Sequence, residues 1–102
     1  MYVRLGSFQI KPGTLDALRT TYNTKCVGVV RKAPGNVDCF LLEPVDDAPC
    51  VVCTMWETEA DAVRYEASGT AGEIVAKVRE FFAGPPKLES YRVTRPVSAV
   101  DK

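Results

Sequence analysis

The chain has 102 residues, of which 46% are hydrophobic and 25% charged, a composition that fits one domain with a modest core. Thirteen basic and thirteen acidic side chains balance, so there is no electrostatic argument for nucleic acid or an anionic membrane as partner. The sequence lacks histidine, the commonest general base, metal ligand and haem ligand. No apolar stretch approaches the roughly 20 residues of a membrane span. The first residues lead straight into a strand pattern without a signal peptide, so we expect a cytoplasmic protein.

The first third of the chain predicts a strand followed by a long helix. Residues 2–10 alternate well enough for a strand, and Lys11-Pro12-Gly13 ends it. Thr14 is placed to cap a helix, with Asp16 in the first turn, where its charge complements the helix dipole. One apolar stripe then recurs at steps of three and four residues, formed by Leu15, Leu18, Tyr22, Cys26 and Val29.

Two strands follow that are apolar on both faces, over residues 37–43 and 49–56. They do not alternate apolar with polar residues, as a strand with one wet face would. Their short polar link predicts an antiparallel hairpin. About three helical segments are enough to cover only one side of a small sheet, so the other side needs a partner. We expect that partner to be a second copy of the chain, which makes the protein a homodimer through its sheet face.

The remainder predicts an interrupted helix and a last strand. Thr58 opens a capping-box-like motif, and a helix runs over 59–68, breaks at Gly69 and resumes near Ala71. A strand follows over 88–94, and residues 96–102 form a loose tail. The order β-α-β-β-α-β is the ferredoxin-like α+β arrangement, a four-stranded antiparallel sheet with both helices on one face. We therefore expect one domain over residues 1–95.

Four cysteines raise the question of a metal or redox site. Cys50 and Cys53 fall within one predicted strand, where residues three apart point to opposite faces and do not chelate one ion. The spacings from Cys26 through Cys39 to this pair, 13, 11 and 3 residues, do not match the paired knuckles of zinc sites. We expect reduced thiols that pack as small hydrophobic groups, with no metal site. A metal or redox role is the alternative.

Three short segments, in this order and spacing, resemble the antibiotic biosynthesis monooxygenase-like (ABM) family of the dimeric α+β-barrel superfamily. The resemblance spans residues 3–94 and is carried by Lys11-Pro12-Gly13, by Ala33-Pro34-Gly35, and by Met55-Trp56-Glu57-Thr58-Glu59-Ala60 with Ser68 beyond it. It implies that the sheets of two protomers form a closed dimeric barrel, and that each protomer keeps a cavity between its sheet and its helices.

The resemblance implies several alternative functions. Some members of the family are cofactor-independent monooxygenases of aromatic polyketides or quinol-like substrates, others degrade haem, and many have no known activity. The haem-degrading branch relies on a histidine after the position of Trp56, and this chain has none. We therefore expect no cofactor. Two functions remain open: a monooxygenase acting on a small aromatic substrate, and a non-catalytic module on the same fold that binds a small apolar or aromatic ligand.

Four residues are the candidates for contacting a substrate. Trp56, at the end of a strand, offers a pocket wall and one N–H donor, and Tyr65 on the interrupted helix faces the same space. Tyr22 lies on the apolar stripe of the first helix. For all three aromatic residues, ordinary core packing is the competing interpretation. Arg92, on a rigid strand, is the fourth candidate, as a cation for an anionic intermediate. Arg64 is considered for the same role outside this set, and surface salt bridges are the alternative use of both. No catalytic base is identified from the sequence.

Overall fold

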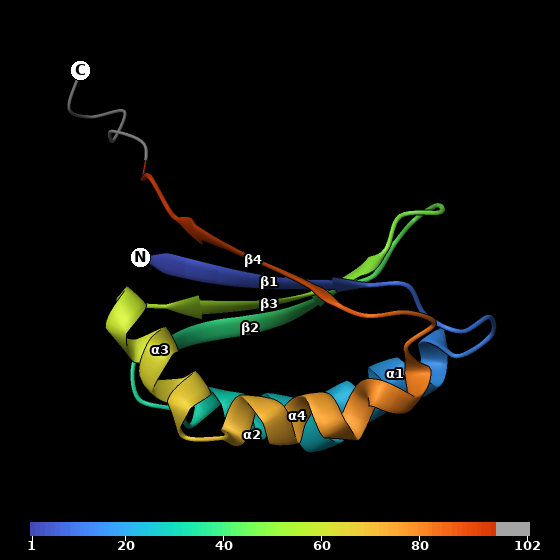
Figure 1. Cartoon of the computed structure of the whole chain (residues 1–102), viewed down its shortest axis with the longest axis horizontal. Helices are drawn as coiled ribbons and strands as arrows, with labels where there is room; N and C mark the ends of the chain where they lie inside the picture. The colour runs from blue at the N-terminus through green and yellow to red at the C-terminus, as the bar shows by residue number, and fades with distance from the viewer. Residues whose placement is uncertain (96–102) are drawn as a thin grey trace.

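The computed structural model describes residues 1–95 and contains one four-stranded antiparallel sheet in the order β2-β3-β1-β4. The helices all lie on one face of this sheet (Figure 1). The elements in chain order are β1 (Tyr2–Phe8), α1 (Leu15–Thr21), a π-helical turn η1 (Tyr22–Cys26), α2 (Val27–Arg31), β2 (Asn36–Leu42), β3 (Cys50–Trp56), α3 (Glu59–Ala67), α4 (Thr70–Val78), a 3₁₀ turn η2 (Arg79–Phe81) and β4 (Lys87–Arg92). The predicted ferredoxin-like α+β fold is confirmed. The predicted tail at 96–102 lies outside the described residues.

The strand registers assign each side chain to one of two faces. Strands β2 and β3 form the expected antiparallel hairpin, with Phe40 opposite Cys53, and β1 pairs with β3 so that Tyr2 lies opposite Trp56. Directly opposed residues share a face, and the face alternates along each strand. Cys50 therefore faces the helices and Cys53 faces away, as their spacing predicts.

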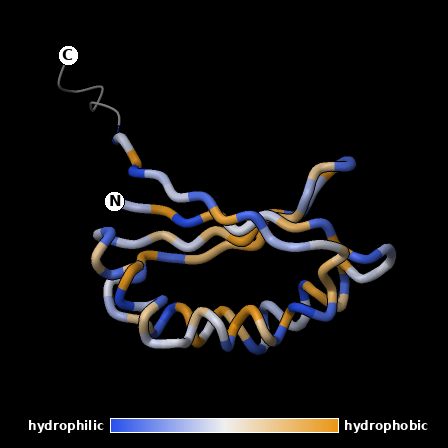
Figure 2. Tube along the Cα trace, viewed as in Figure 1, coloured by the Kyte–Doolittle hydropathy of each residue, from blue (hydrophilic) through white to orange (hydrophobic). Residues whose placement is uncertain are grey.

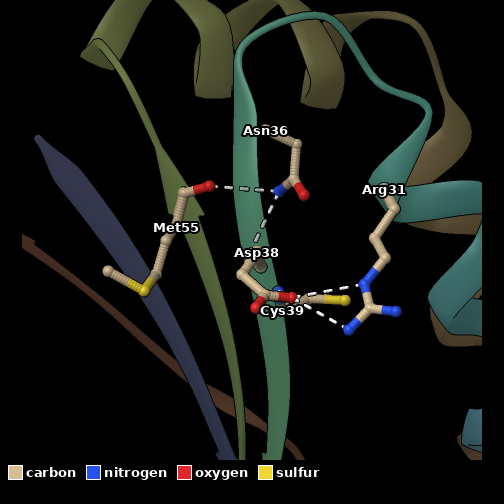
Figure 3. Close-up of polar contacts among 5 residues, drawn as sticks. All are labelled: Arg31, Asn36, Asp38, Cys39 and Met55. Atoms are coloured by element: carbon tan, nitrogen blue, oxygen red, sulfur yellow. Dashed lines mark hydrogen bonds and ion pairs between the residues drawn. The ribbon is translucent and has the colours of Figure 1, made fainter.

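A β-bulge distorts the start of β2, where the register with β3 shifts between Asn36 and Asp38. The Asn36 side-chain amide donates to the carbonyls of Met55 at 3.1 Å and Asp38 at 3.3 Å (Figure 3). Asp38 accepts from the backbone N–H of Cys39 at 2.8 Å and from Arg31 at 3.1–3.2 Å. These bonds hold the pKa of Asp38 below its usual value, with the Cys39 amide as the larger cause. Both the bulge and the end of α2 are thereby fixed against the sheet.

The first helical segment is not one regular helix, because its middle turn is π-helical. Leu18, Tyr22, Cys26 and Val30 are buried, whereas Val29 is 39% exposed. The prediction that Val29 belongs to the apolar stripe is wrong. The wider π turn shifts the following residues by about one position, so that Val30 is buried in its place. Thr14 precedes α1 as predicted, but its hydroxyl donates to the Lys11 carbonyl at 2.6 Å and does not cap the first turn.

The interruption of the second helix occurs at Gly69, as predicted. Thr58 caps α3 by accepting from the Asp61 N–H at 3.2 Å, and Gly69 has φ +85°, a left-handed conformation that glycine adopts without cost. Gly35 also has positive φ, and a Cβ there would collide with the Asp61 side chain. This close approach explains why a glycine precedes β2 and how α3 packs against that turn.

The two faces of the sheet differ in how they are covered. The face toward the helices carries the buried core, including Phe8, Cys39, Cys50 and Trp56. No helix within residues 1–95 covers the opposite face (Figure 1), where Phe40, Leu42 and Tyr91 are 41%, 49% and 48% exposed. Hydrophobic colour predominates along β2 and β3 in Figure 2, whereas β1 and β4 are mixed and the tip of the turn between β2 and β3 is hydrophilic. An apolar surface therefore lies open on one side of the molecule.

Candidate functional site

A cavity of about 420 Å³ lies between the inner face of the sheet and the helices. This volume is within the range of about 300–1,000 Å³ typical of small-molecule sites. Most of its lining is apolar: β1 and β3 contribute one wall, α3 and α4 the opposite wall, and the beginning of β4 an edge.

No helix within residues 1–95 combines the length and hydropathy needed to cross a membrane.

Trp56 and Tyr65 form an aromatic wall of the cavity. Trp56 is 0% exposed, and the two ring centroids are 4.9 Å apart with the planes tilted by 38°. The Trp56 indole N–H donates to the Thr54 hydroxyl at 2.9 Å. Thr54 was not singled out from the sequence, although its position two residues before Trp56 on one strand places both on the same face. The N–H expected to be offered to a substrate already has an acceptor in this structure.

Tyr22 begins the π turn and lines the same cavity, next to Cys39. The residue is 4% exposed, and its hydroxyl has no hydrogen-bond partner among residues 1–95. Burial raises the pKa of Tyr22 well above its ordinary value, and the neighbouring Cys39 thiol adds to this effect. Burial likewise raises the pKa of Tyr65 to about 12. Both phenols are therefore neutral hydroxyl groups at physiological pH.

The charged side chains on the cavity wall are Arg4, Glu66 and Arg79. Arg4 extends from β1 and forms an ion pair with Glu66 of α3, which links the sheet to the helical layer. Their side chains are 27% and 36% exposed. None of the three was identified from the sequence. The alternation of β1, which places Tyr2 and Phe8 on the inner face, was the signal that would have found Arg4.

Arg92 does not line this cavity. Its side chain is 87% exposed and lies 3.7 Å from the Glu59 carboxylate, at the start of α3. Arg64 pairs with Asp61 at 3.0 Å and lines a separate groove of about 390 Å³ beside α2. The structure thus brings Trp56, Tyr65 and Tyr22 together and leaves both predicted cations outside.

All four cysteines are free thiols, and Cys26, Cys39 and Cys50 are buried. Burial raises the pKa of Cys26, Cys50 and Cys53, so these thiols are poor nucleophiles at neutral pH. Within residues 1–95, no three His, Cys, Asp or Glu side chains gather closely enough to hold a metal ion.

The arrangement of sheet, helices and cavity matches a known family. The family model for antibiotic biosynthesis monooxygenase (ABM) covers residues 1–77. The chain belongs to the ABM family. The matched part of this ABM protein reaches from β1 into α4 and includes every aromatic residue of the wall described above.

Solved structures with the same fold include proteins of different activities. A monooxygenase from the gene ActVA-Orf6 of Streptomyces coelicolor, in complex with nanaomycin D, is 20% identical over 95% of this chain and 90% of that one, with a TM-score of 0.79. The haem degrader MhuD of Mycobacterium tuberculosis, with two haems in its active site, is 23% identical over 96% and 100%, with a TM-score of 0.77. Rv0793 of the same organism is 18% identical over 95% and 98%, with a TM-score of 0.73. At these identities the likeness extends to the fold alone. Comparison with curated protein sequences finds no significant match.

Proposed function

We propose that this ABM protein is a homodimeric, cofactor-independent monooxygenase that acts on a small aromatic or quinol-like substrate. The observation that carries the proposal is the aromatic cavity of about 420 Å³ between sheet and helices. A planar substrate fits against half-buried Tyr65, which packs on the buried Trp56 ring, because offset or tilted aromatic contacts are favourable. The ABM structure that holds nanaomycin D supports the same assignment.

The reaction asks the protein to hold a substrate anion beside O₂ in a dry site. For a substrate with an activated methylene group, R₂CH₂ and O₂ give R₂C=O and H₂O. Carbon loses four electrons, one oxygen atom enters the carbonyl, and the other leaves as water with the two protons. Glu66 is the one carboxylate that lines the cavity among residues 1–95, so it or a bound water accepts the first proton. The Arg4 guanidinium beside it stabilises the resulting anion.

Haem does not fit the residues of this cavity. The chain has no histidine, and the axial ligands left on the cavity wall are Tyr22, Tyr65 and the buried Cys39, each of which binds iron only when deprotonated. The raised pKa values of Tyr22 and Tyr65 oppose that ionisation. The haem-degrading activity of one structural relative is therefore not proposed for this chain. A spectral titration with haem that produces no shift of the Soret band is the expected result.

A non-catalytic binding module on the same fold is the second candidate. It is favoured by two hydrogen-bonded pairs in the cavity wall. The Trp56 N–H is satisfied by Thr54, and the Glu66 carboxylate is paired with Arg4. The donor and the base that an oxygenase needs are thus both occupied before a ligand binds.

Oxygen consumption separates these two functions. Wild type is assayed with a panel of quinols and anthrones beside Trp56→Phe, and beside Val63→Ala on the exposed face of α3 as the control. A monooxygenase consumes one O₂ per product, slows in Trp56→Phe and is unaffected in Val63→Ala. Binding of these compounds without oxygen consumption would support the binding module instead.

The homodimer is proposed from the open sheet face. In the row Phe40, Cys53, Leu5, neighbouring β-strands place three apolar side chains side by side on that face. An obligate dimer buries at least about 800 Å² on each protomer, and such a row supplies the centre of the interface. Light scattering is expected to give about twice the chain mass of 11.2 kDa.

Cys53→Asp tests which face forms the dimer. The variant buries one carboxylate from each protomer, at a cost of the order of 4 kcal/mol or more per dimer. The variant should therefore be monomeric at micromolar concentration. The control is Val63→Asp on the exposed surface of α3, which should remain dimeric. A dimer that tolerates Cys53→Asp would place the interface elsewhere.

A further inference from the structure

The charges on the cavity wall point to one class of ligand. Arg4 and Arg79 are cations and Glu66 is an anion, while the phenols of Tyr22 and Tyr65 stay neutral. Arg4 and Glu66 form an ion pair, so the surplus positive charge of the wall belongs to Arg79, which is exposed. The Arg4 side chain is only 27% exposed, and a cation partly removed from water interacts more strongly with a ligand anion than a surface charge does.

Arg4 is placed to bind that anion. It lies on β1, which is flanked by β3 and β4, so its backbone is held on both sides, opposite Thr54 and Ser90. Opposed residues on neighbouring strands have Cβ atoms about 4.5–5.5 Å apart. The Arg4 side chain thus starts beside Thr54, whose hydroxyl accepts from Trp56. An aromatic ring that rests on half-buried Tyr65, the residue before Glu66 in α3, brings its acidic substituent within reach of Arg4.

The guanidinium keeps donors for such a group. Arginine has five N–H donors, and within residues 1–95 Arg4 uses one nitrogen for Glu66 and another for a long contact of 3.5 Å to the Tyr2 hydroxyl. A carboxylate or phenolate can therefore bind beside Glu66 without displacing it. The alternative interpretation is that the Arg4–Glu66 pair has a purely structural role and links β1 to α3. A partly exposed ion pair contributes little to stability, so packing of Trp56, Tyr65 and Ala62 does more to hold α3 in place.

We propose that the cavity selects aromatic ligands carrying one negative charge, and that Arg4 binds this charge while Glu66 limits its strength. The inference rests on the proposed function, since it assumes that the cavity binds an aromatic ring. It adds the substrate class, an aromatic carboxylate or phenolate, and a specificity residue outside the set identified from the sequence.

Calorimetric titration with 2-naphthoate and 2-naphthamide tests the proposal, because the two compounds share a ring and differ in charge. Wild type is expected to bind naphthoate about tenfold or more tightly than naphthamide, as charged hydrogen bonds contribute about 1.5–3 kcal/mol. Glu66→Gln should strengthen naphthoate binding alone, because it frees the guanidinium. Arg4→Met combined with Glu66→Gln avoids an unpaired carboxylate and should abolish the preference while naphthamide affinity is retained.

Arg92→Met is the matched control, since it removes an arginine that lies outside the cavity. It should leave the preference for naphthoate intact. Equal affinity of wild type for both compounds, or a preference that survives in the Arg4 variant, would overturn the inference and leave the proposed function standing. Failure of both compounds to bind wild type would count against the proposed aromatic site itself. Should the double variant not fold, a Glu66→Gln protein whose naphthoate affinity does not rise overturns the inference.

Discussion

Thr54→Val is the sharpest perturbation of the cavity wall. The substitution keeps the shape of the side chain and suits a β-strand, but it removes the acceptor for the Trp56 indole N–H, 2.9 Å away. Trp56 is 0% exposed, so its donor is left without a partner. An unsatisfied buried donor costs about 1–3 kcal/mol, and each kcal/mol lowers the Tm of a domain of this size by about 4–8 °C.

The assay is urea unfolding of both proteins at one fixed concentration, because association contributes to the apparent stability of a dimer. A double-mutant cycle with Trp56→Phe isolates the bond: Thr54→Val should cost much less in the Trp56→Phe background, where no N–H remains. The reasoning fails if Thr54→Val costs less than about 0.5 kcal/mol in wild type, or if its cost is the same in both backgrounds.

Three further predictions concern the helices and Tyr65. Gly69→Ala should lose about 1–2 kcal/mol because φ is +85°, whereas Gly72→Ala within α4 should gain about 0.5–1 kcal/mol; equal effects in urea unfolding would contradict this. Deleting the exposed Asn23 should convert the π turn to α-helix and preserve native circular dichroism. Deleting Ala17 should cost about 2–5 kcal/mol by turning core side chains off the sheet; equal costs would refute the phase argument. Since burial raises the pKa of Tyr65 to about 12 from 10.0, its contribution to stability is complete below pH 10 and lost between pH 10 and 12. Tyr65→Phe should reduce that alkaline loss of unfolding free energy, and an unchanged loss would reject the assignment.

The strands were the part of the fold that the sequence predicted best. The predicted range 37–43 differs from β2 by one residue at each end, and the predicted range 49–56 differs from β3 by one residue at its start. Side chains in a strand alternate with period two, so an apolar run also reveals which residues share a face. Two apolar faces in one short strand then indicate that both sides of the sheet are to be covered.

The phase of the first helix was not predictable from periodicity. At about 100° per residue, eleven residues return to nearly the same direction, so a regular helix that buries Leu18 also buries Val29. The π turn adds one residue, and Val30 takes that place, 3% exposed. No propensity pattern in residues 22–26 indicates a π turn. The predicted helix phase is therefore wrong from the point where regular α-helical hydrogen bonding ends.

The sequence placed Trp56 and Tyr65 in the same space and missed the charged pair on that cavity wall, while contact of either set with a substrate stays a prediction. Trp56 and Tyr65 were found because each follows from its position on one element. The Arg4–Glu66 pair joins residues 62 positions apart, a contact that no local pattern encodes. Arg92 shares the inner face with Tyr2, its partner on β1, but it lies at the end of an edge strand. Its long side chain reaches out to Glu59 and not into the cavity.

The small residues around the cavity indicate that the cavity has a function. Gly6 and Gly72 both line it, yet neither has the positive φ found within residues 1–95 at Gly13, Gly35 and Gly69. A Cβ at Gly72 would meet nothing within 4 Å, and one at Gly6 would make only ordinary contact with Leu88 at 3.5 Å. Backbone geometry therefore does not demand these glycines, and larger side chains would fill the void and add stability. A chain that forgoes this stabilisation on the inner face, while its apolar outer face stays open, fits the homodimer with a ligand cavity proposed above.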